Sequence, residues 1–363
     1  MIALLGSQGS VNTAPVRAPT PDQLWISARA LQEATGWVWK PEGLCRQDAC
    51  VPLAPALRDA IWDGDAIDAL ALWRALERPA LSDAAGSVYV LGESAADRNA
   101  QLTSLVAPDF ALPDLEGRVH RLSDFRGKKV FVSTWASWCG CRLDLPVWQS
   151  LYEELGAQGF VVIAVAMDSR GPDAAREWIE NAKPTYPCLI DRNHLLADLY
   201  HMVNVPQAVW IDEQGRIVRP TEISGASASQ NTDKRAATRA YYCNALRDWV
   251  KHGSASRFVF DPTEAAAHVP QSDTKVALAH ANFRLGQHLY EHGQEEEGAQ
   301  LLAAAVELHP DSWNFWRQMR NLKHVHGSYG PKFFARVEAF IAQGKHYYPA
   351  PDMPGIKEIY TQK

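Results

Sequence analysis

The chain has 363 residues and a formal net charge of −6, and 47% of its residues are hydrophobic while 21% are charged. This composition is typical of a folded globular protein, and the length indicates two or three domains. The negative charge argues against a nucleic-acid partner, because phosphate binding requires a concentrated basic surface. No run approaches the ~20 apolar residues of a membrane span, so we expect no membrane partner.

The first residues lack the features of a secretory leader. Met1–Gly6 has no basic region, and its apolar stretch is shorter than the hydrophobic core of a leader. We therefore expect a cytoplasmic protein. In that reducing compartment, six cysteines are too few for a disulfide framework, and close cysteine pairs indicate redox or metal sites. The close pairs are Cys45 with Cys50 and Cys139 with Cys141.

The N-terminal part is predicted to be a small α+β domain of no recognised family over residues 20–100. A flexible lead-in, rich in Ser, Ala, Pro and Thr, is expected over residues 1–19. The elements of the domain follow from apolar spacing and turn residues. They are a helix from Asp22 to about Gly36, short strands from Trp37 to Leu53, a helical stretch over Ala54–Leu76 and a strand over Val88–Leu91.

The central part, residues 103–255, alternates strands with helices and is predicted to be an α/β domain. Phe160–Met167 is a continuous apolar run, as expected of a strand that is buried on both faces. Pro172–Ala182 is predicted to be a helix, because proline is favoured in a first helical turn. The other predicted elements are strands at Val130–Thr134, Cys188–Ile190, Ala208–Ile211 and Arg216–Val218, and helices near Leu145–Leu155, Leu195–Tyr200 and Lys234–Lys251.

The C-terminal part, residues 261–348, is predicted to be all-α and is followed by a tail over residues 349–363. It resembles one tetratricopeptide repeat at Leu285, Gly286, Leu289, Gly298, Leu302, Ala305 and Pro310. Trp316 begins a second candidate copy. We expect these helices to pack on the central domain and to offer a surface to a protein partner.

Several motifs of the central part occur together in one family. They are Ala107-Pro-Asp-Phe-Ala-Leu112, Val130-Phe-Val-Ser-Thr-Trp-Ala-Ser-Trp-Cys139, Cys141-Arg142 followed by Pro146, and Asn204-Val-Pro-Gln207 before Val209-Trp-Ile-Asp212. This region resembles the redoxin domain of the TlpA/ResA-like branch of the thioredoxin superfamily. The resemblance implies a thioredoxin-like fold for the α/β central domain, which lies in sequence between the predicted small α+β domain and the predicted all-α region. It also implies a redox-active disulfide and a cis-proline facing it, which falls on Pro206.

The resemblance places the chemistry on Cys139 and Cys141. A cysteine at a strand-to-helix turn faces the positive end of the helix dipole and unpaired N–H groups, and both favour the nucleophilic thiolate. We expect Cys139 to attack a substrate disulfide and Cys141 to resolve the mixed disulfide. Trp138 and Pro206 would form an apolar rim for an extended peptide, and a cis Val205–Pro206 bond would offer it a backbone edge. The alternative that Pro206 is an ordinary turn proline stays open.

The spacing of the two cysteines departs from the family pattern. The family has two residues between its cysteines, whereas this chain has only Gly140. At about 100° per residue, helical positions two apart point to nearly opposite sides, so both cysteines cannot be regular helix residues and still form a disulfide. Gly140 can adopt backbone angles that other residues avoid, which would let a tight turn bring the sulfurs together.

The buried carboxylate that relatives often carry near the active site is missing from its expected places. One of these positions holds Pro113, with Asp114 beside it, and the other holds Ser133. We therefore assign no general base from the sequence.

A peroxidase pattern does not fit the chain. Peroxiredoxin-type relatives place a proline seven residues, and a threonine or serine three residues, before the reactive cysteine. Counting back gives Val132 and Ala136 from Cys139, and Thr134 and Trp138 from Cys141. Peroxide reduction is therefore the less favoured activity.

The remaining cysteines leave one question open. Cys45 and Cys50 bracket a turn, either as small, partly buried residues or as a second dithiol that exchanges with Cys139. Cys188 and Cys243 are expected to be inert core thiols. The twelve histidines show no metal-ligand spacing, and we expect neither a metal nor a cofactor.

The leading function is a thiol–disulfide oxidoreductase. Its partners would be protein or small-molecule thiols and disulfides, selected by the flanking domains. Two alternatives stay open: Cys139 and Cys141 hold a soft metal ion such as Cu(I) as thiolates, or the chain is a scaffold with an inactive thioredoxin domain.

Overall fold

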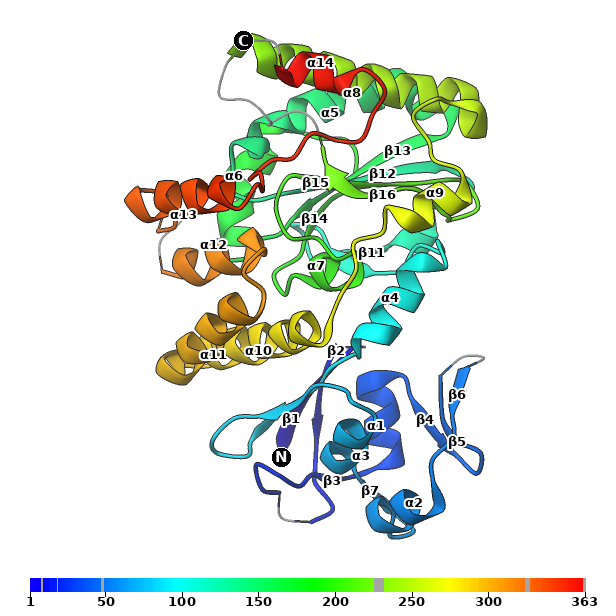
Figure 1. Ribbon diagram of the computed structural model, residues 1–363, viewed down its shortest axis with the longest axis vertical. Coiled ribbons are helices and arrows are strands. Elements are labelled where there is room, and N and C mark those ends of the chain that lie inside the picture. The colour runs from blue at the N-terminus through cyan, green and yellow to red at the C-terminus, as the bar shows by residue number, and fades with distance from the viewer. Residues whose placement is uncertain (8, 18, 47–48, 225–231, 324–326, 362–363) are drawn as a thin grey trace. The chain divides into compact units, whose positions relative to one another are not determined.

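The computed structural model (Figure 1) describes residues 1–7, 9–17, 19–46, 49–224, 232–323 and 327–361. The chain forms two compact units. Met1–Arg98 and Ser272–Pro310 form one, here called the N-terminal unit, and Asn99–Gln271 and Asp311–Lys363 form the other, the central unit. The predicted all-α region of residues 261–348 is thus divided, because its residues 272–310 belong to the N-terminal unit. Its likeness to a tetratricopeptide repeat stays a prediction.

The N-terminal unit contains a four-stranded sheet in the order β2 (Gly9–Thr13), β1 (Ile2–Gly6), β9 (Val88–Leu91) and β8 (Ala80–Ser82). β1 pairs antiparallel with β2 and parallel with β9, and Leu4 is fully buried. The prediction of a flexible lead-in over residues 1–19 is therefore wrong where these strands lie. The prediction failed because β1 is held by a long-range pairing, in which Ala3 lies opposite Val88, and no local pattern reveals such a contact.

Short elements complete this part of the N-terminal unit. The residues Leu24, Ile26, Leu31, Leu70 and Trp73 are fully buried in its core. The elements are β3 (Trp25–Ser27) paired with β7 (Ala66–Asp68), a three-stranded sheet of β4 (Val38–Lys40), β5 (Gly43–Arg46) and β6 (Ala49–Val51), and the helices α1 (Ala28–Thr35), α2 (Pro55–Ile61) and α3 (Ala69–Ala75).

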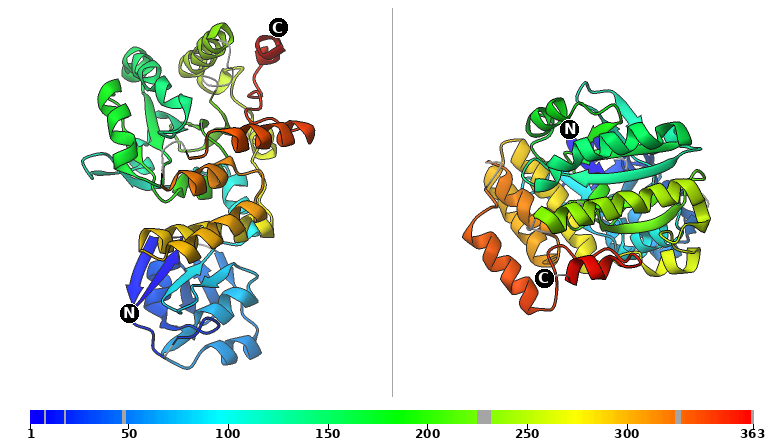
Figure 2. Two further views of the ribbon diagram at one scale, coloured as in Figure 1. Left: turned by 90° about the vertical axis from the view of Figure 1, so that its left-hand side faces the viewer. Right: turned by 90° about the horizontal axis from the view of Figure 1, so that it is seen from above.

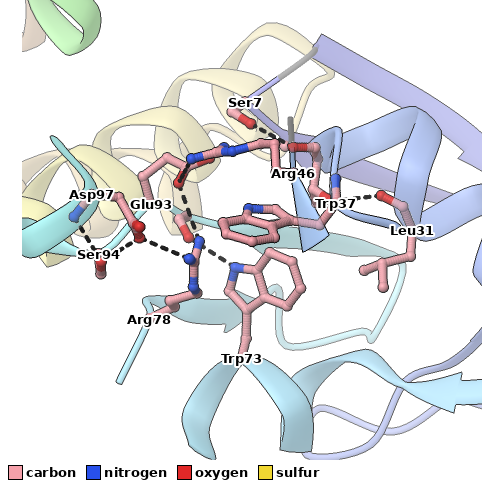
Figure 3. A network of polar contacts seen from close by, with 12 residues as sticks. Ser7, Leu31, Trp37, Arg46, Trp73, Arg78, Glu93, Ser94 and Asp97 are labelled. Atoms are coloured by element: carbon pink, nitrogen blue, oxygen red, sulfur yellow. Dashed lines mark hydrogen bonds and ion pairs between the residues drawn. The ribbon is translucent and has the colours of Figure 1, made fainter. Parts of the chain in front are cut away.

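A cluster of charged side chains is partly buried against this core (Figure 3). Arg78 pairs with Glu93 at 3.1 Å and with Asp97 at 2.8 Å, and its guanidinium lies 4.4 Å from the ring centroid of Trp37. Arg46 binds the same Glu93 and lies over the same ring. Burial lowers the pKa of Arg78, while the two carboxylates oppose this change. The cluster joins β5 to the segment after β9.

Two helices of the N-terminal unit, α10 (Thr274–Glu291) and α11 (Glu295–Leu308), pack closely against each other. A Cβ atom at Gly286 would lie 2.8 Å from the carbonyl oxygen of Gly298, and one at Gly298 would lie 2.7 Å from that of Gly286. Only glycine permits so close an approach of two helix backbones. On its sheet-facing side, α10 buries Leu285 and Leu289 against residues of β1 and β9.

The central unit is built around a five-stranded sheet. Its order is β14 (Cys188–Ile190), β13 (Phe160–Ala166), β12 (Lys129–Trp135), β15 (Gln207–Ile211) and β16 (Ile217–Ile223). β12, β13 and β14 are parallel, whereas β15 is antiparallel to both β12 and β16. β12 and β13 are buried along their whole length, as predicted for central strands.

Helices cover both faces of this sheet. α5 (Leu145–Leu155) and α8 (Thr232–His252) pack together above it in Figure 1 and run side by side in the view from above (Figure 2, right), while α7 (Leu195–Leu199) lies below it. The α6 helix spans Pro172–Ala182, as predicted. The other elements include α4 (Ala95–Thr103, which crosses the boundary between the units), β10 (Ala111–Pro113), β11 (Val119–Arg121), α9 (Pro262–Ala267), α12 (Trp313–Asn321), α13 (Pro331–Ala342) and α14 (Ile356–Thr361). Among the helices of the described residues, none is both long and apolar enough to cross a membrane.

Strand directions bring two loops to one edge of the sheet. In the ladder between β12 and β15, Ser133 lies opposite Ala208. Because these strands are antiparallel, the carboxyl end of β12 and the amino end of β15 lie at the same edge. The loop that carries the cysteines and the loop that carries Pro206 therefore meet there.

Candidate active site

Cys139 lies at the junction between β12 and the helical segment that follows. Its backbone is extended, with φ −97° and ψ 139°, and it caps a short 3₁₀ helix over Gly140–Asp144 that continues into α5. Its sulfur accepts the N–H of Cys141 at 3.3 Å. The structure joins the sulfurs of Cys139 and Cys141 in a disulfide, with their Cα atoms 5.2 Å apart.

The backbone accommodates the one-residue spacing between Cys139 and Cys141, but not through the unusual backbone angles that were expected at Gly140. Cys139 precedes the helix as its cap, so only Cys141 is a helical residue, in agreement with the argument that both cannot be. Gly140 is not among the described glycines with positive φ, so the turn does not use backbone angles reserved for glycine. The extended conformation of Cys139 turns its sulfur toward Cys141 instead.

The loop before β15 meets this turn. The Val205–Pro206 peptide bond is cis, as the resemblance implies, and the sulfur of Cys139 lies 3.7 Å from the carbonyl oxygen of Val205. Thr134 of β12 holds the loop, because its hydroxyl donates to the carbonyl of Gln207 at 2.8 Å and accepts the N–H of Gln207 at 3.1 Å. The structure thus brings Cys139, Val205 and Pro206 together.

Helix α12 lies across the loops at this edge. Asn314 donates to the carbonyl oxygen of Met202 at 3.1 Å. Gln318 donates to the carbonyl oxygen of Met167 at 3.0 Å and accepts the N–H of Ser169 at 3.2 Å. These polar side chains are buried, so α12 is fixed to the loops after β13 and before β15 by specific hydrogen bonds rather than by apolar contact alone.

Arg317 joins α12 to the cysteine turn. Its guanidinium carbon lies 4.3 Å from the ring centroid of Trp138, and one of its nitrogens donates to the hydroxyl of Tyr347 at 3.0 Å. Both Arg317 and Trp138 are buried. A cation therefore lies against the residue that directly precedes Cys139.

Tyr347 and Tyr348 belong to the segment of the chain that contacts the sulfur of Cys139. The side-chain amide of Asn204 donates to the carbonyl of Tyr347 at 2.8 Å. The hydroxyl of Tyr348 lies 3.7 Å from the sulfur of Cys139 and 3.2 Å from the carbonyl oxygen of Val205. We call α12 together with Lys345–Tyr348 the C-terminal cover.

The C-terminal cover alters the expected substrate site. Cys139 and Cys141 are only 3% and 2% exposed, and Trp138 is 5% exposed. The N–H of Val205 donates to the side-chain oxygen of Asn204 at 2.9 Å, and the hydroxyl of Tyr348 contacts its carbonyl. The backbone edge that the sequence predicted to be open to a partner is therefore occupied by groups of the chain itself.

A buried carboxylate that the sequence analysis missed supports the cysteine turn. Asp168 is fully buried and accepts hydrogen bonds from the hydroxyl of Ser137 at 2.5 Å and from its N–H at 3.2 Å. Burial raises the pKa of Asp168, although these hydrogen bonds oppose the change. Ser137 lies two residues before Cys139, so Asp168 helps to fix the start of the turn. Its place directly after the apolar run Phe160–Met167 was the available signal.

The positions where relatives often carry an acid have other roles here. Asp114 lies in the β10–β11 hairpin and contacts the Nε2 atom of His120 at 2.8 Å. Partial burial raises the pKa of Asp114, but hydrogen bonds from His120 and from the N–H of Arg118 outweigh this and hold it below its usual value. Ser133 is buried within β12. Asp168, which is hydrogen-bonded to Ser137 ahead of the turn, thus lies at neither of the two expected positions.

The second cysteine pair lies in the N-terminal unit. Cys45 on β5 and Cys50 on β6 are directly opposite in the ladder, with Cα atoms 4.0 Å apart, and their sulfurs form a disulfide. Cys45 is buried and Cys50 is exposed. Within the described part of the chain, Glu42 and this pair bring three potential metal-ligand atoms within 4.8 Å of one another. Disulfide sulfurs are not thiolate ligands, so this group would need reduction before it could hold a metal.

The two remaining cysteines are buried thiols. Burial raises the pKa of Cys188 to about 12 and that of Cys243 to about 11. Both therefore stay protonated at neutral pH, which suits inert core residues.

Comparison with known proteins identifies the family of the central unit. Residues 104–219 match the AhpC/TSA family. Thiol-disulfide oxidoreductase ResA of Geobacillus thermodenitrificans is 34% identical over 122 residues, which are 33% of this chain and 70% of the relative. Thioredoxin-like protein YneN of Bacillus subtilis is 36% identical over 114 residues, 31% of this chain and 66% of the relative.

Solved structures include similar domains. The crystal structure of the thioredoxin domain of a thiol-disulfide oxidoreductase from Bacteroides vulgatus is 26% identical in sequence. The match covers 38% of this chain and 95% of that chain, with a TM-score of 0.30. The similarity to ResA, which spans more than two thirds of that relative, decides the assignment: this chain belongs to the TlpA/ResA-like family of thiol–disulfide oxidoreductases.

Proposed function

We propose that Cys139 and Cys141 are the redox pair through which this oxidoreductase exchanges electrons with its partners. The main support is the position of the Cys139 sulfur, which accepts the N–H of Cys141 at the start of a helix and faces the loop of the cis-proline. Such N–H groups and the positive end of a helix dipole stabilise a thiolate over a thiol. Trp138, Val205 and Pro206 would then line the path of the substrate sulfur once the C-terminal cover has moved away from the buried Cys139.

The reaction follows from thiol–disulfide exchange. The Cys139 thiolate attacks one sulfur of a substrate disulfide, which forms a mixed disulfide and releases the other substrate sulfur as a thiolate. The Cys141 thiolate then attacks the sulfur of Cys139, which forms the Cys139–Cys141 disulfide and releases the second substrate thiolate. A partner dithiol restores the reduced form by the same steps in reverse.

Single serine variants test this order of attack. Cys139→Ser should abolish reduction of a model disulfide, whereas Cys141→Ser should accumulate a mixed disulfide on Cys139 that mass spectrometry detects. Cys243→Ala, which removes a thiol outside the site, is the control and should keep the activity. Capture of substrate by Cys139→Ser through Cys141 would reverse the two roles, and full activity in both serine variants would reject the pair.

The soft-metal alternative is tested on the same samples. Thiolates bind Cu(I) tightly, so a metal-binding protein would retain about one equivalent of metal after reduction and dialysis. We expect metal analysis to find none bound through Cys139 and Cys141. An inactive scaffold, in contrast, would show neither metal nor disulfide exchange.

We further propose that Cys45 and Cys50 are a second dithiol that exchanges with Cys139. Cys50 is exposed, so a partner thiol can reach one sulfur of this disulfide. A dithiol on the same chain acts at high effective concentration. The double variant Cys45→Ser with Cys50→Ser should slow turnover with a protein reductant and leave reduction of Cys139–Cys141 by dithiothreitol unchanged. Unchanged turnover with both reductants would make the pair structural.

Partner choice and location complete the proposal. We propose that the flanking regions, including α10 and α11, select a protein partner in the cytoplasm. Mixed disulfides trapped in cells on the Cys141→Ser variant, identified by mass spectrometry, test both points. Partners drawn only from another compartment would contradict the location.

A further inference from the structure

The hydroxyl of Tyr348 touches the reacting sulfur, and the family resemblance does not account for it. It lies 3.7 Å from the sulfur of Cys139, within hydrogen-bonding reach for sulfur, and 3.2 Å from the carbonyl oxygen of Val205. These two acceptors belong to the cysteine turn and to the cis-proline loop. A single O–H group therefore lies between both parts of the active site.

Several interactions hold Tyr348 in this place through its neighbour. The carbonyl of Tyr347 accepts the side-chain N–H of Asn204 at 2.8 Å, and its hydroxyl accepts a hydrogen bond from Arg317 at 3.0 Å. The ring of Tyr347 lies 4.4 Å from that of Trp313 and 4.2 Å from that of Tyr348, measured between centroids. The segment is thus anchored at the backbone, at the hydroxyl and at the ring.

The beginning of the same segment is also fixed. Lys345 forms an ion pair with Asp311 at 2.5 Å, just before α12. Arg317, which holds Tyr347, lies over Trp138 next to Cys139. The contacts of Lys345 and Tyr347 therefore fix the segment that leads to the Tyr348 hydroxyl.

The redox state of Cys139 decides which acceptor the phenol prefers. A disulfide sulfur is a weak acceptor, so in the oxidised form the O–H donates to the carbonyl of Val205. A thiolate carries a full charge, and hydrogen bonds to charged acceptors are roughly twice as strong as those between neutral groups. Reduction of Cys139 therefore favours rotation of the O–H toward its sulfur.

We propose that Tyr348 is a catalytic residue of the disulfide exchange, whose hydroxyl donates a hydrogen bond to the Cys139 thiolate. This inference rests on the proposed role of Cys139 as the nucleophile. The bond stabilises the thiolate before it attacks a substrate disulfide, and again when Cys139 leaves as a thiolate during reduction by a partner dithiol. Tyr348 keeps its proton throughout, so the electron and proton balance of the exchange is unchanged.

The test is Tyr348→Phe, which removes the hydroxyl and keeps the ring. Fully reduced protein is alkylated with iodoacetamide over a range of pH, and the labelled cysteine is identified by peptide mapping. Loss of a hydrogen bond to a charged group should raise the pKa of the Cys139 thiol, and with it the midpoint of the alkylation profile, by about one pH unit. At any pH well below that midpoint, the thiolate population should therefore be ~10-fold lower than in the wild type. The control Tyr329→Phe removes the hydroxyl of an exposed tyrosine and should leave the profile unchanged.

A second measurement separates hydrogen bonding from access. The ultraviolet absorbance of the thiolate, titrated against pH, does not depend on entry of a reagent and should show the same upward shift in Tyr348→Phe. An unchanged absorbance midpoint overturns the proposal, as does alkylation that becomes faster at every pH, which would make Tyr348 only an obstruction. If instead Cys141 is the residue labelled in the wild-type protein, the assignment of Cys139 as nucleophile fails, and with it the proposed function.

Discussion

Cys45 and Cys50 are held by the strands that carry them, whereas Cys139 and Cys141 lie on a turn whose surroundings come from distant parts of the chain. The first pair faces across a ladder between neighbouring strands. The second is reached by Arg317, which packs on Trp138, and by Tyr348, which touches Cys139. The comparison shows that a disulfide can be placed by local pairing alone, while the environment of a reactive one needs contacts that close over it from elsewhere.

The largest effect on stability is expected at the locally paired disulfide. Cys45→Ala with Cys50→Ala should lower the free energy of unfolding by about 2 kcal/mol, because a cross-link that closes a short loop restricts the unfolded chain. Urea unfolding under oxidising conditions measures this change. Dithiothreitol should remove the difference between the two proteins, because it reduces Cys45–Cys50 in the wild type alone, whereas it reduces Cys139–Cys141 in both. An equal stability of both proteins would show that this disulfide does not stabilise the fold.

A smaller effect is expected where the C-terminal cover meets the cysteine turn. Arg317→Lys keeps the charge but loses the planar group that stacks on Trp138 and binds Tyr347, and should cost about 1 kcal/mol. The matched control is Arg257→Lys, because the guanidinium of Arg257 lies over Phe258 at an exposed position and its loss should cost less than about 0.5 kcal/mol. Urea unfolding followed by tryptophan fluorescence compares the two. Equal losses would mean that burial adds nothing to the contact of Arg317.

The smallest effect on folding stability is expected at Asp168, the buried acid that is hydrogen-bonded to Ser137. Burial raises the pKa of Asp168 above its ordinary value of 3.8, so the folded protein holds this proton more tightly than the unfolded chain does. As the pH rises through that ordinary value, the unfolded chain ionises first, and the contribution of Asp168 to folding stability falls until the carboxyl of the folded state also ionises. Asp168→Asn should remove this decline.

Urea unfolding at a series of pH values from acid to neutral checks the Asp168 prediction. The variant curve should be flatter than that of the wild type above pH 4 or so. Curves of the same slope would mean that Asp168 titrates alike in both states.

Local sequence signals predicted the elements of the central unit well. The helix over Pro172–Ala182 was correct at both ends, and the apolar run Phe160–Met167 contains β13. The thioredoxin-like fold and the meeting of the cysteine turn with the Val205–Pro206 loop also followed from the sequence. These features depend on periodicity and on motifs, which lie within short stretches of chain.

Other features depend on contacts that no short stretch contains. The helical stretch predicted over Ala54–Leu76 is interrupted by β7, because Ala66–Asp68 pairs with β3 far away in sequence. The C-terminal cover was missed for the same reason, since Tyr348 reaches a loop 143 residues earlier in the chain. The sequence of the C-terminal cover contains no motif that predicts a contact with Cys139.

Cys188 can serve as a probe of local opening at the edge of the central sheet. Its thiol lies on β14, at one edge of the central sheet, and is both buried and protonated at neutral pH, since burial raises its pKa to about 12. A thiol reagent can modify it only in the moments when that edge opens. The rate of its modification, compared with the rate in the unfolded chain, therefore reports the free energy of local opening, much as amide hydrogen exchange does. The native sequence thus carries its own reporter of local opening at the β14 edge of the central sheet, and no substitution is needed to use it.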